Sequence, residues 1–142
     1  MTVILRHAAE ADAKNVASLL TELGYPSVEA NARDRLVRSL RSATSCVVVA
    51  EADGEVIGTI NAELVPYFPN GSTICRVTAL VVSSHHRSRG VGEKLLARIA
   101  EFAREHGCSG IEVTSSQRRV AAHRFYERLG FSKNSFRFFR AL

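Results

Sequence analysis

Apolar residues recur along the chain with two spacings, and these spacings predict helices and strands. Val91, Leu95 and Ile99 repeat at four-residue intervals, which places them on one face of a helix. The segment Cys46–Glu51 is almost continuously apolar instead, as in a strand buried on both faces. The predicted strands are Thr2–Arg6, Cys46–Glu51, Val56–Val65, Thr73–Val82, Gly110–Thr114 and one or two within Phe131–Arg140. The predicted helices are Glu10–Leu23, a segment from Ser27 to Leu40, Gly90–Glu105 and Arg118–Leu129.

Turn residues separate these elements and indicate the fold class. Asp53-Gly54 is typical of a tight hairpin, Gly58 indicates a β-bulge, and Ser27 is a candidate cap for the second helix, whose arginines are expected opposite its apolar face. The order is β-α-α-β-β-β-α-β-α-β. It predicts an α/β fold with helices on the faces of a mixed sheet, and not a doubly wound parallel sheet, which needs a helix after every strand. No repeat or linker interrupts the chain, so residues 1–142 are expected to form one domain.

Positive charge is concentrated in the second half of the chain. The 142 residues carry 19 Lys+Arg and 14 Asp+Glu, a net charge of +5. Residues 1–80 hold 7 basic and 9 acidic side chains, whereas residues 81–142 hold 12 basic and 5 acidic ones. A basic half indicates either an anionic partner, such as nucleic acid, a membrane or a phosphorylated cofactor, or a solvated arginine-rich surface.

Several other classes of protein are not expected. The longest apolar runs are far shorter than the ~20 residues that span a bilayer, and the first residues do not resemble a signal peptide. Cys46, Cys75 and Cys108 are odd in number and widely spaced, which favours reduced thiols in a cytoplasmic protein. The adjacent histidines His85 and His86 point to opposite sides of an extended segment, so no metal site is predicted.

The segment from Leu80 to Leu96 contains the clearest candidate binding site. An apolar strand leads into a loop with arginines and two close glycines, Gly90 and Gly92, and a helix begins at once. A helix N-terminus offers unpaired N–H groups and the positive end of the helix dipole, and glycine lets an anion approach the backbone. This combination predicts a phosphate site. The glycine spacing fits neither the P-loop nor the dinucleotide fingerprint, because Leu95 stands where the latter needs a third glycine.

The remaining pattern, Arg87-x-x-Gly90-x-Gly92, resembles the acetyl-CoA pyrophosphate loop of the GNAT superfamily of N-acetyltransferases. The resemblance implies that acetyl-CoA is the acyl donor and that the loop binds its pyrophosphate. The loop residues concerned are Arg87, Ser88, Arg89, Gly90, Val91 and Gly92. It also implies that the main chain of the preceding strand, Leu80, Val81 and Val82, holds the pantetheine arm and polarises the thioester carbonyl.

A second motif supports the same family. The superfamily's last helix commonly carries an alanine, a hydrophobic-Tyr-Glu group and a Gly-Phe pair, matched here by Ala122, Phe125-Tyr126-Glu127 and Gly130-Phe131. The resemblance makes Tyr126 the general acid that protonates the leaving CoA thiolate, although its position also suits a core tyrosine. The family's frequent asparagine is replaced by Arg119, a candidate contact for a CoA phosphate, and His123 is a minor candidate on the same helix face.

The general base and the acceptor are less clearly indicated. Many relatives carry a glutamate on the fourth strand, where this chain has Thr78 and Ala79. Glu63, acting through water, is the alternative base, with Glu112 a further one; a neutral amine would need none. In this fold the acceptor pocket is framed by residues 23–33 and 65–73. The aromatic candidates for its lining are Tyr25, Tyr67 and Phe68.

Three functions follow from these features. We expect an N-acetyltransferase that acts on a small-molecule amine, with a homodimer allowed by the resemblance. The alternative is a CoA-binding sensor that has lost its chemistry, as the missing fourth-strand carboxylate suggests. Nucleic-acid binding is not expected, since no binding motif is present and glutamates interrupt the basic helices.

Overall fold

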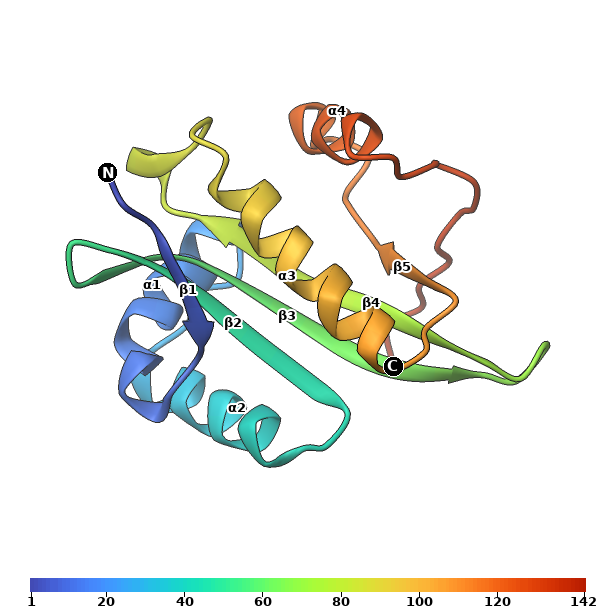
Figure 1. Ribbon diagram of the computed structural model, residues 1–142, viewed down its shortest axis with the longest axis horizontal. Helices are drawn as coiled ribbons and strands as arrows, with labels where there is room; N and C mark the ends of the chain where they lie inside the picture. Colours follow the sequence, from blue (N-terminus) through green and yellow to red (C-terminus); the bar gives the residue numbers. More distant parts are fainter. The chain divides into compact units, whose positions relative to one another are not determined.

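The computed structural model describes residues 1–142, which form two compact units, Met1–Glu112 and Val113–Leu142 (Figure 1). Four helices and a five-stranded sheet confirm the predicted α/β fold class. The strands are β1 (Ile4–His7), β2 (Ser45–Ala52), β3 (Glu55–Tyr67), β4 (Ser72–Val82) and β5 (Gly110–Val113). The helices are α1 (Ala13–Leu23), α2 (Glu29–Arg41), α3 (Val91–Glu105) and α4 (Val120–Arg128), with short 3₁₀ turns η1 (Glu10–Asp12) and η2 (Ser84–His86). None of the helices is long and apolar enough to cross a membrane.

The strands lie in the order β1-β2-β3-β4-β5, and the first four pair antiparallel. The N–H of Ser109 donates to the carbonyl of Thr73 at 2.9 Å, and further along both strands Arg76 pairs with Glu112. The partner of Thr73 precedes the partner of Arg76 in the sequence, so β5 runs parallel to β4. Because β5 has four residues and β4 has eleven, β5 accompanies only the first part of β4.

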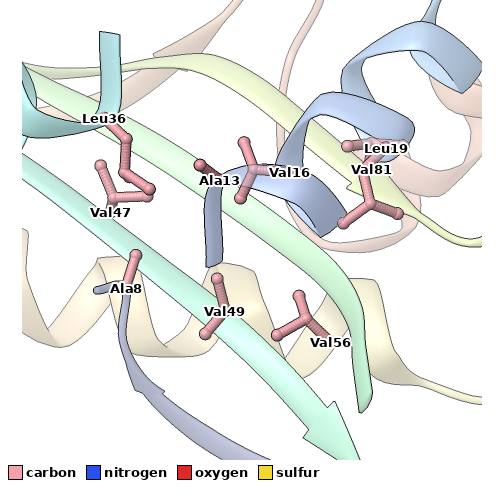
Figure 2. Close-up of a cluster of buried hydrophobic side chains, with 9 residues drawn as sticks. All are labelled: Ala8, Ala13, Val16, Leu19, Leu36, Val47, Val49, Val56 and Val81. Carbon is pink, nitrogen blue, oxygen red and sulfur yellow. The ribbon is translucent and has the colours of Figure 1, made fainter. Parts of the chain in front are cut away.

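The sheet is covered on both faces, which explains the continuous apolar run in β2. Helices α1 and α2 lie on one face and α3 lies on the other (Figure 1). Figure 2 shows the core on the α1 and α2 side, where Val16 and Leu36 from the helices meet Val47 and Val81 from the strands. On the other face, Leu95 and Ile99 of α3 are fully buried.

The predicted hairpin turn and the predicted β-bulge are both present in the sheet. Asp53 and Gly54 both have positive φ, 52° and 78°, as a two-residue hairpin turn requires. Beside Gly58 the β2–β3 register shifts, which confirms a bulge there. A Cβ at Gly58 would lie 3.3 Å from Leu95 Cδ1 and 3.3 Å from the Val81 carbonyl oxygen, so glycine lets α3 pack closely on β3.

Two predictions about local structure are wrong. Ser27 does not cap α2: the N-cap is Val28, and the Ser27 hydroxyl instead donates to the Tyr25 carbonyl at 2.8 Å. Residues 131–142 contain no strand, although one or two are predicted within Phe131–Arg140. A strand needs a neighbouring strand for its backbone hydrogen bonds, and this segment has none. The second unit therefore contains the last residue of β5, the connection to α4, α4 itself and a long irregular C-terminal segment.

Candidate active site

The loop between β4 and α3 leaves the start of α3 open. Ser88 and Gly90 both have positive φ, 62° and 79°, and Gly90 is the N-cap of the helix. The first helical hydrogen bond runs from the Lys94 N–H to the Gly90 carbonyl at 3.1 Å. No side chain caps this end, so the N–H groups of the first turn have no partner within the helix.

This loop is tied back to the rest of its unit by two side-chain contacts. Arg87, which heads the predicted phosphate motif, donates from Nε to the carbonyl oxygen of Val82 at 3.1 Å. Ser84 donates from its hydroxyl to Glu22 of α1 at 3.1 Å. Arg87 therefore also joins the loop to the last residue of β4, a role that the sequence did not indicate.

The start of α3 fits a pyrophosphate. It combines unpaired N–H groups with the positive end of a 15-residue helix dipole. A Cβ built on Gly90 meets no atom within 4 Å, so space above the backbone is open. Arg87 and Arg89 are exposed on the same loop and add positive charge. An anion bound here would meet both the free N–H groups and this positive charge.

A cavity of about 240 Å³ opens on the α1 and α2 side of the sheet, next to β4. At this point β4 has a bulge: Ala79 pairs with Asn61 and Val77 with Ala62, which leaves Thr78 as the extra residue. The Thr78 hydroxyl donates to Asn61 Oδ1. The lining is mostly apolar and consists of Val16, Leu20, Ala32, Arg35, Leu36, Ser39, Val47, Thr59, Asn61, Thr78 and Ala79.

The residues that the sequence proposed for base and acceptor pocket lie elsewhere. The Glu63 carboxylate accepts a hydrogen bond from Ser45 at 2.5 Å and is not part of the cavity lining. Tyr25 is 66% exposed, and Tyr67 and Phe68 lie at the tip of the β3–β4 hairpin beside a separate open hollow. None of these three aromatic residues lines the cavity next to β4. The alternative base Glu112 is paired with a β4 arginine.

The second unit carries the three remaining candidates on and before α4. The Tyr126 ring packs edge-on against Phe131, with centroids 5.6 Å apart, and burial raises the pKa of its phenol while Arg119 opposes the shift. The phenol is therefore protonated at neutral pH, as a proton donor must be. His123 Nε2 lies 2.8 Å from the carbonyl oxygen of Ser116, which also accepts from the Arg119 N–H. His123 and Arg119 thus shape the turn that begins α4.

The cysteines are not candidates for nucleophiles. All three are free, and Cys46 and Cys75 are buried. Burial raises the pKa of the Cys75 thiol to about 11 and also raises the pKa of Cys46. Both therefore remain protonated thiols at neutral pH.

The cavity lining includes polar residues that the sequence pattern does not single out. Arg35 is exposed, as expected of an arginine opposite the apolar face of α2, and it also lines the cavity with Ala32, Leu36 and Ser39 of the same helix. Positions 32, 35, 36 and 39 share one helix face, so a polar interruption of that face was the available signal. The involvement of Asn61 depends on strand register, which the local sequence does not show.

Comparison with known proteins identifies the family and the fold. The model of the Acetyltransferase (GNAT) family matches residues 9–131. The chain is 33% identical over 139 residues to an aminoalkylphosphonate N-acetyltransferase of Salmonella typhimurium, a match that covers 97% of this chain and 90% of the relative. Among solved structures, a transcriptional regulator from Bacillus halodurans has a TM-score of 0.91 at 23% identity, covering 99% of this chain and all of the other. The aminoglycoside N-acetyltransferase AAC(6')-Iy, solved with CoA, has a TM-score of 0.89 at 19% identity, covering 99% and 95%. These structures share the fold.

Proposed function

The chain belongs to the acetyltransferase (GNAT) family, and on that premise we propose that it transfers the acetyl group of acetyl-CoA directly to the primary amine of a small molecule. One observation carries the proposal: strand β4 borders the cavity and also leads toward the start of α3. Its residues Thr78 and Ala79 line the cavity, and its end at Val82 leads into the open start of α3. An acyl donor held at α3 and an acceptor in the cavity would therefore meet along one strand.

The donor half of the proposal rests on backbone groups. We assign the pyrophosphate of CoA to the N–H groups at the start of α3, with charge from Arg87 and Arg89. The pantetheine arm would run along the main chain of Leu80–Val82, on the side of β4 that β5 accompanies only in part. The main-chain N–H groups there would stabilise the oxyanion as the amine attacks the thioester carbonyl.

Proton transfer completes the proposed reaction. The amine nitrogen bonds to the carbonyl carbon, the carbon–sulfur bond breaks, and Tyr126 donates a proton to the departing thiolate. The amine proton passes through water to Glu63, which lies outside the cavity lining but two residues from Asn61 on β3, or the amine enters already neutral. Arg119 and His123 are assigned to the adenosine phosphates of CoA, an interpretation that follows the family motif.

The size of the cavity and the relatives support a small acceptor. A cavity of about 240 Å³ is below the range of roughly 300–1,000 Å³ that accommodates drug-sized ligands. The name of the Salmonella relative specifies a small amine, an aminoalkylphosphonate. We further propose that residues 1–142 act as one domain in a cytoplasmic enzyme, as its free thiols suggest. We also propose a homodimer, for which the exposed Phe136, Phe138 and Phe139 offer apolar surface.

Release of CoA measured with a thiol reagent, over a panel of primary amines, tests the transfer. Calorimetry with CoA tests the donor site separately. A matched pair of variants sharpens the second measurement, because Gly90 and Gly107 lie near opposite ends of α3, both with positive φ and open space. Gly90→Ala and Gly107→Ala should cost similar stability, about 1 kcal/mol each, but only Gly90→Ala should weaken CoA binding.

The outcomes separate the candidate functions. Turnover with at least one amine supports the proposal. CoA binding without turnover on any amine favours the sensor, which the lack of a carboxylate among the cavity residues would explain. Absence of CoA binding at millimolar concentration would refute both.

A further inference from the structure

Arg35 is the only charged side chain that lines the cavity next to β4. Its Nη1 donates to the Ser27 hydroxyl at 3.1 Å, which orients the guanidinium with a neutral partner. No carboxylate lies within ion-pair distance of it, whereas Arg33 on the same helix pairs with Glu29 at 2.9 Å. A guanidinium has five donors in a planar fork, so most of those of Arg35 remain available to an anion in the cavity.

The polar groups on the strand side of the cavity have a different character. The Thr59 hydroxyl is already used, since it donates to the Val48 carbonyl at 3.1 Å. Thr78 donates to Asn61 Oδ1, which leaves the oxygen lone pairs of both side chains able to accept from an amine N–H. The bulge at Thr78 also lies two residues before Leu80, where the proposed path of the acyl donor along β4 begins. The strand side therefore suits the reacting amine.

Between these two ends the walls are apolar. Val16 and Leu20 come from α1, and Val47 comes from β2. Such walls fit a short alkyl chain. A second positive charge on the ligand would be repelled by Arg35, which disfavours diamines and polyamines.

We propose that the acceptor is a short-chain primary amine whose far end carries an oxyanion, a phosphonate or a carboxylate, bound by Arg35. This inference rests on the proposed acetyl transfer and narrows its acceptor. The fork of Arg35 binds two oxygens of the anion, and the alkyl chain crosses the apolar walls. The amine is then directed at Thr78 and the thioester.

Four amines of similar length test the proposal: 3-aminopropylphosphonate, 4-aminobutyrate, butylamine and 1,4-diaminobutane. We expect kcat/KM to be at least about tenfold higher for an anionic amine than for butylamine, and lowest for the diamine. The comparison of 3-aminopropylphosphonate with 4-aminobutyrate shows whether a phosphonate or a carboxylate is preferred. Equal kcat/KM values for anionic and neutral amines would overturn the inference while leaving the proposed function standing.

Two variants of α2 locate the effect. Arg35→Gln should lower the ratio of anionic to neutral kcat/KM about tenfold to a hundredfold. Arg38→Gln makes the same change on the same helix, at an exposed arginine outside the cavity lining, and should leave the ratio unchanged. Equal effects of the two variants would overturn the assignment to Arg35.

Binding without turnover keeps the inference testable if the transfer proposal fails. Calorimetry with 3-aminopropylphosphonate and with 4-aminobutyrate, in the presence of CoA, measures acceptor binding directly. A dissociation constant at least about tenfold weaker for Arg35→Gln than for Arg38→Gln supports the anion site. No binding of either oxyanionic amine to the unaltered protein contradicts it.

Discussion

Replacing Asp12 by asparagine should destabilise the fold at neutral pH, because Asp12 holds the entry to α1 through three hydrogen bonds. Arg6 on β1 donates from Nη1 and Nη2 to its two carboxylate oxygens at 2.8 and 2.9 Å, and the Ala9 N–H donates to it at 2.8 Å. The same guanidinium donates from Nε to Glu51 of β2 at 2.8 Å. Asp12 is 7% exposed, so water cannot replace these partners.

The size of the effect follows from this geometry. Asparagine can accept only on its one oxygen, and its amide N–H groups would face an arginine donor. Hydrogen bonds to charged groups contribute about 1.5–3 kcal/mol each, and the half-exposed Arg6 reduces the loss through solvent screening. We expect a loss of about 2 kcal/mol in the free energy of unfolding. For a chain of 142 residues this corresponds to a decrease of about 7 °C in Tm.

The effect of Asp12→Asn should also depend on pH. The hydrogen bonds from Arg6 lower the pKa of Asp12 below its ordinary 3.8, with a further contribution from the Ala9 N–H, against an opposing effect of burial. A carboxylate with a lowered pKa in the folded state stabilises fully above its unfolded pKa. The stabilisation is lost as the pH falls through the unfolded and then the folded pKa. The difference between wild type and variant should therefore be constant from pH 6 to 8 and shrink below about pH 4.

Urea denaturation of both proteins at several pH values measures this difference. Asp34→Asn is the matched control, since Asp34 is an exposed aspartate on α2 without an ion pair, and should change stability by less than about 0.5 kcal/mol. The reasoning is refuted if the two variants are equally stable at pH 7. It is also refuted if the loss caused by Asp12→Asn persists undiminished at pH 3.

Three further predictions concern packing and chemistry. Gly58→Ala should reduce the free energy of unfolding by about 1–2 kcal/mol, because the new Cβ lies 3.3 Å from the Val81 carbonyl, whereas Gly110→Ala meets nothing within 4 Å; denaturant titration compares them. Tyr126→Phe should lower kcat about a hundredfold or more while the protein stays folded. Steady-state kinetics measures kcat and a melting curve checks the fold. An unchanged kcat would contradict the proton-donor role. Because burial raises the pKa of Tyr126, the alkaline fall of kcat should lie above pH 10 in the wild-type pH profile, and a fall centred below pH 9 would assign it to another group.

The parts of the site that were predictable are those in which a short segment determines its own geometry. Gly90 adopts a positive φ and begins α3, as a glycine between an apolar strand and an amphipathic helix is expected to. The Asp53-Gly54 hairpin is local in the same sense. The motif around Tyr126 could be recognised because all its residues lie within one short segment, from Ala122 to Phe131.

The parts that were not predictable depend on partners distant in sequence. One or two strands are predicted within Phe131–Arg140, but a strand forms only beside another strand, and nothing in the segment shows whether one is available. Arg35 is a surface charge, and its place in the cavity lining depends on how α2 packs over the sheet. Tyr67 and Phe68 were plausible pocket residues, yet the long β3–β4 hairpin carries them away from the cavity.

The bulge at Thr78 shows why the alternation of apolar residues along β4 does not reveal the cavity beside it. Above the bulge, Ala79 and Val81 face α1 and α2; below it, pairing places Val77 opposite Ala62, on the α3 side. Without the extra residue, strict alternation would put Val77 on the α1 and α2 side and turn Arg76 into the core beneath α3. The inserted threonine therefore lets both halves of β4 bury their apolar residues. It also leaves a polar side chain at the cavity, where the acceptor amine is proposed to bind.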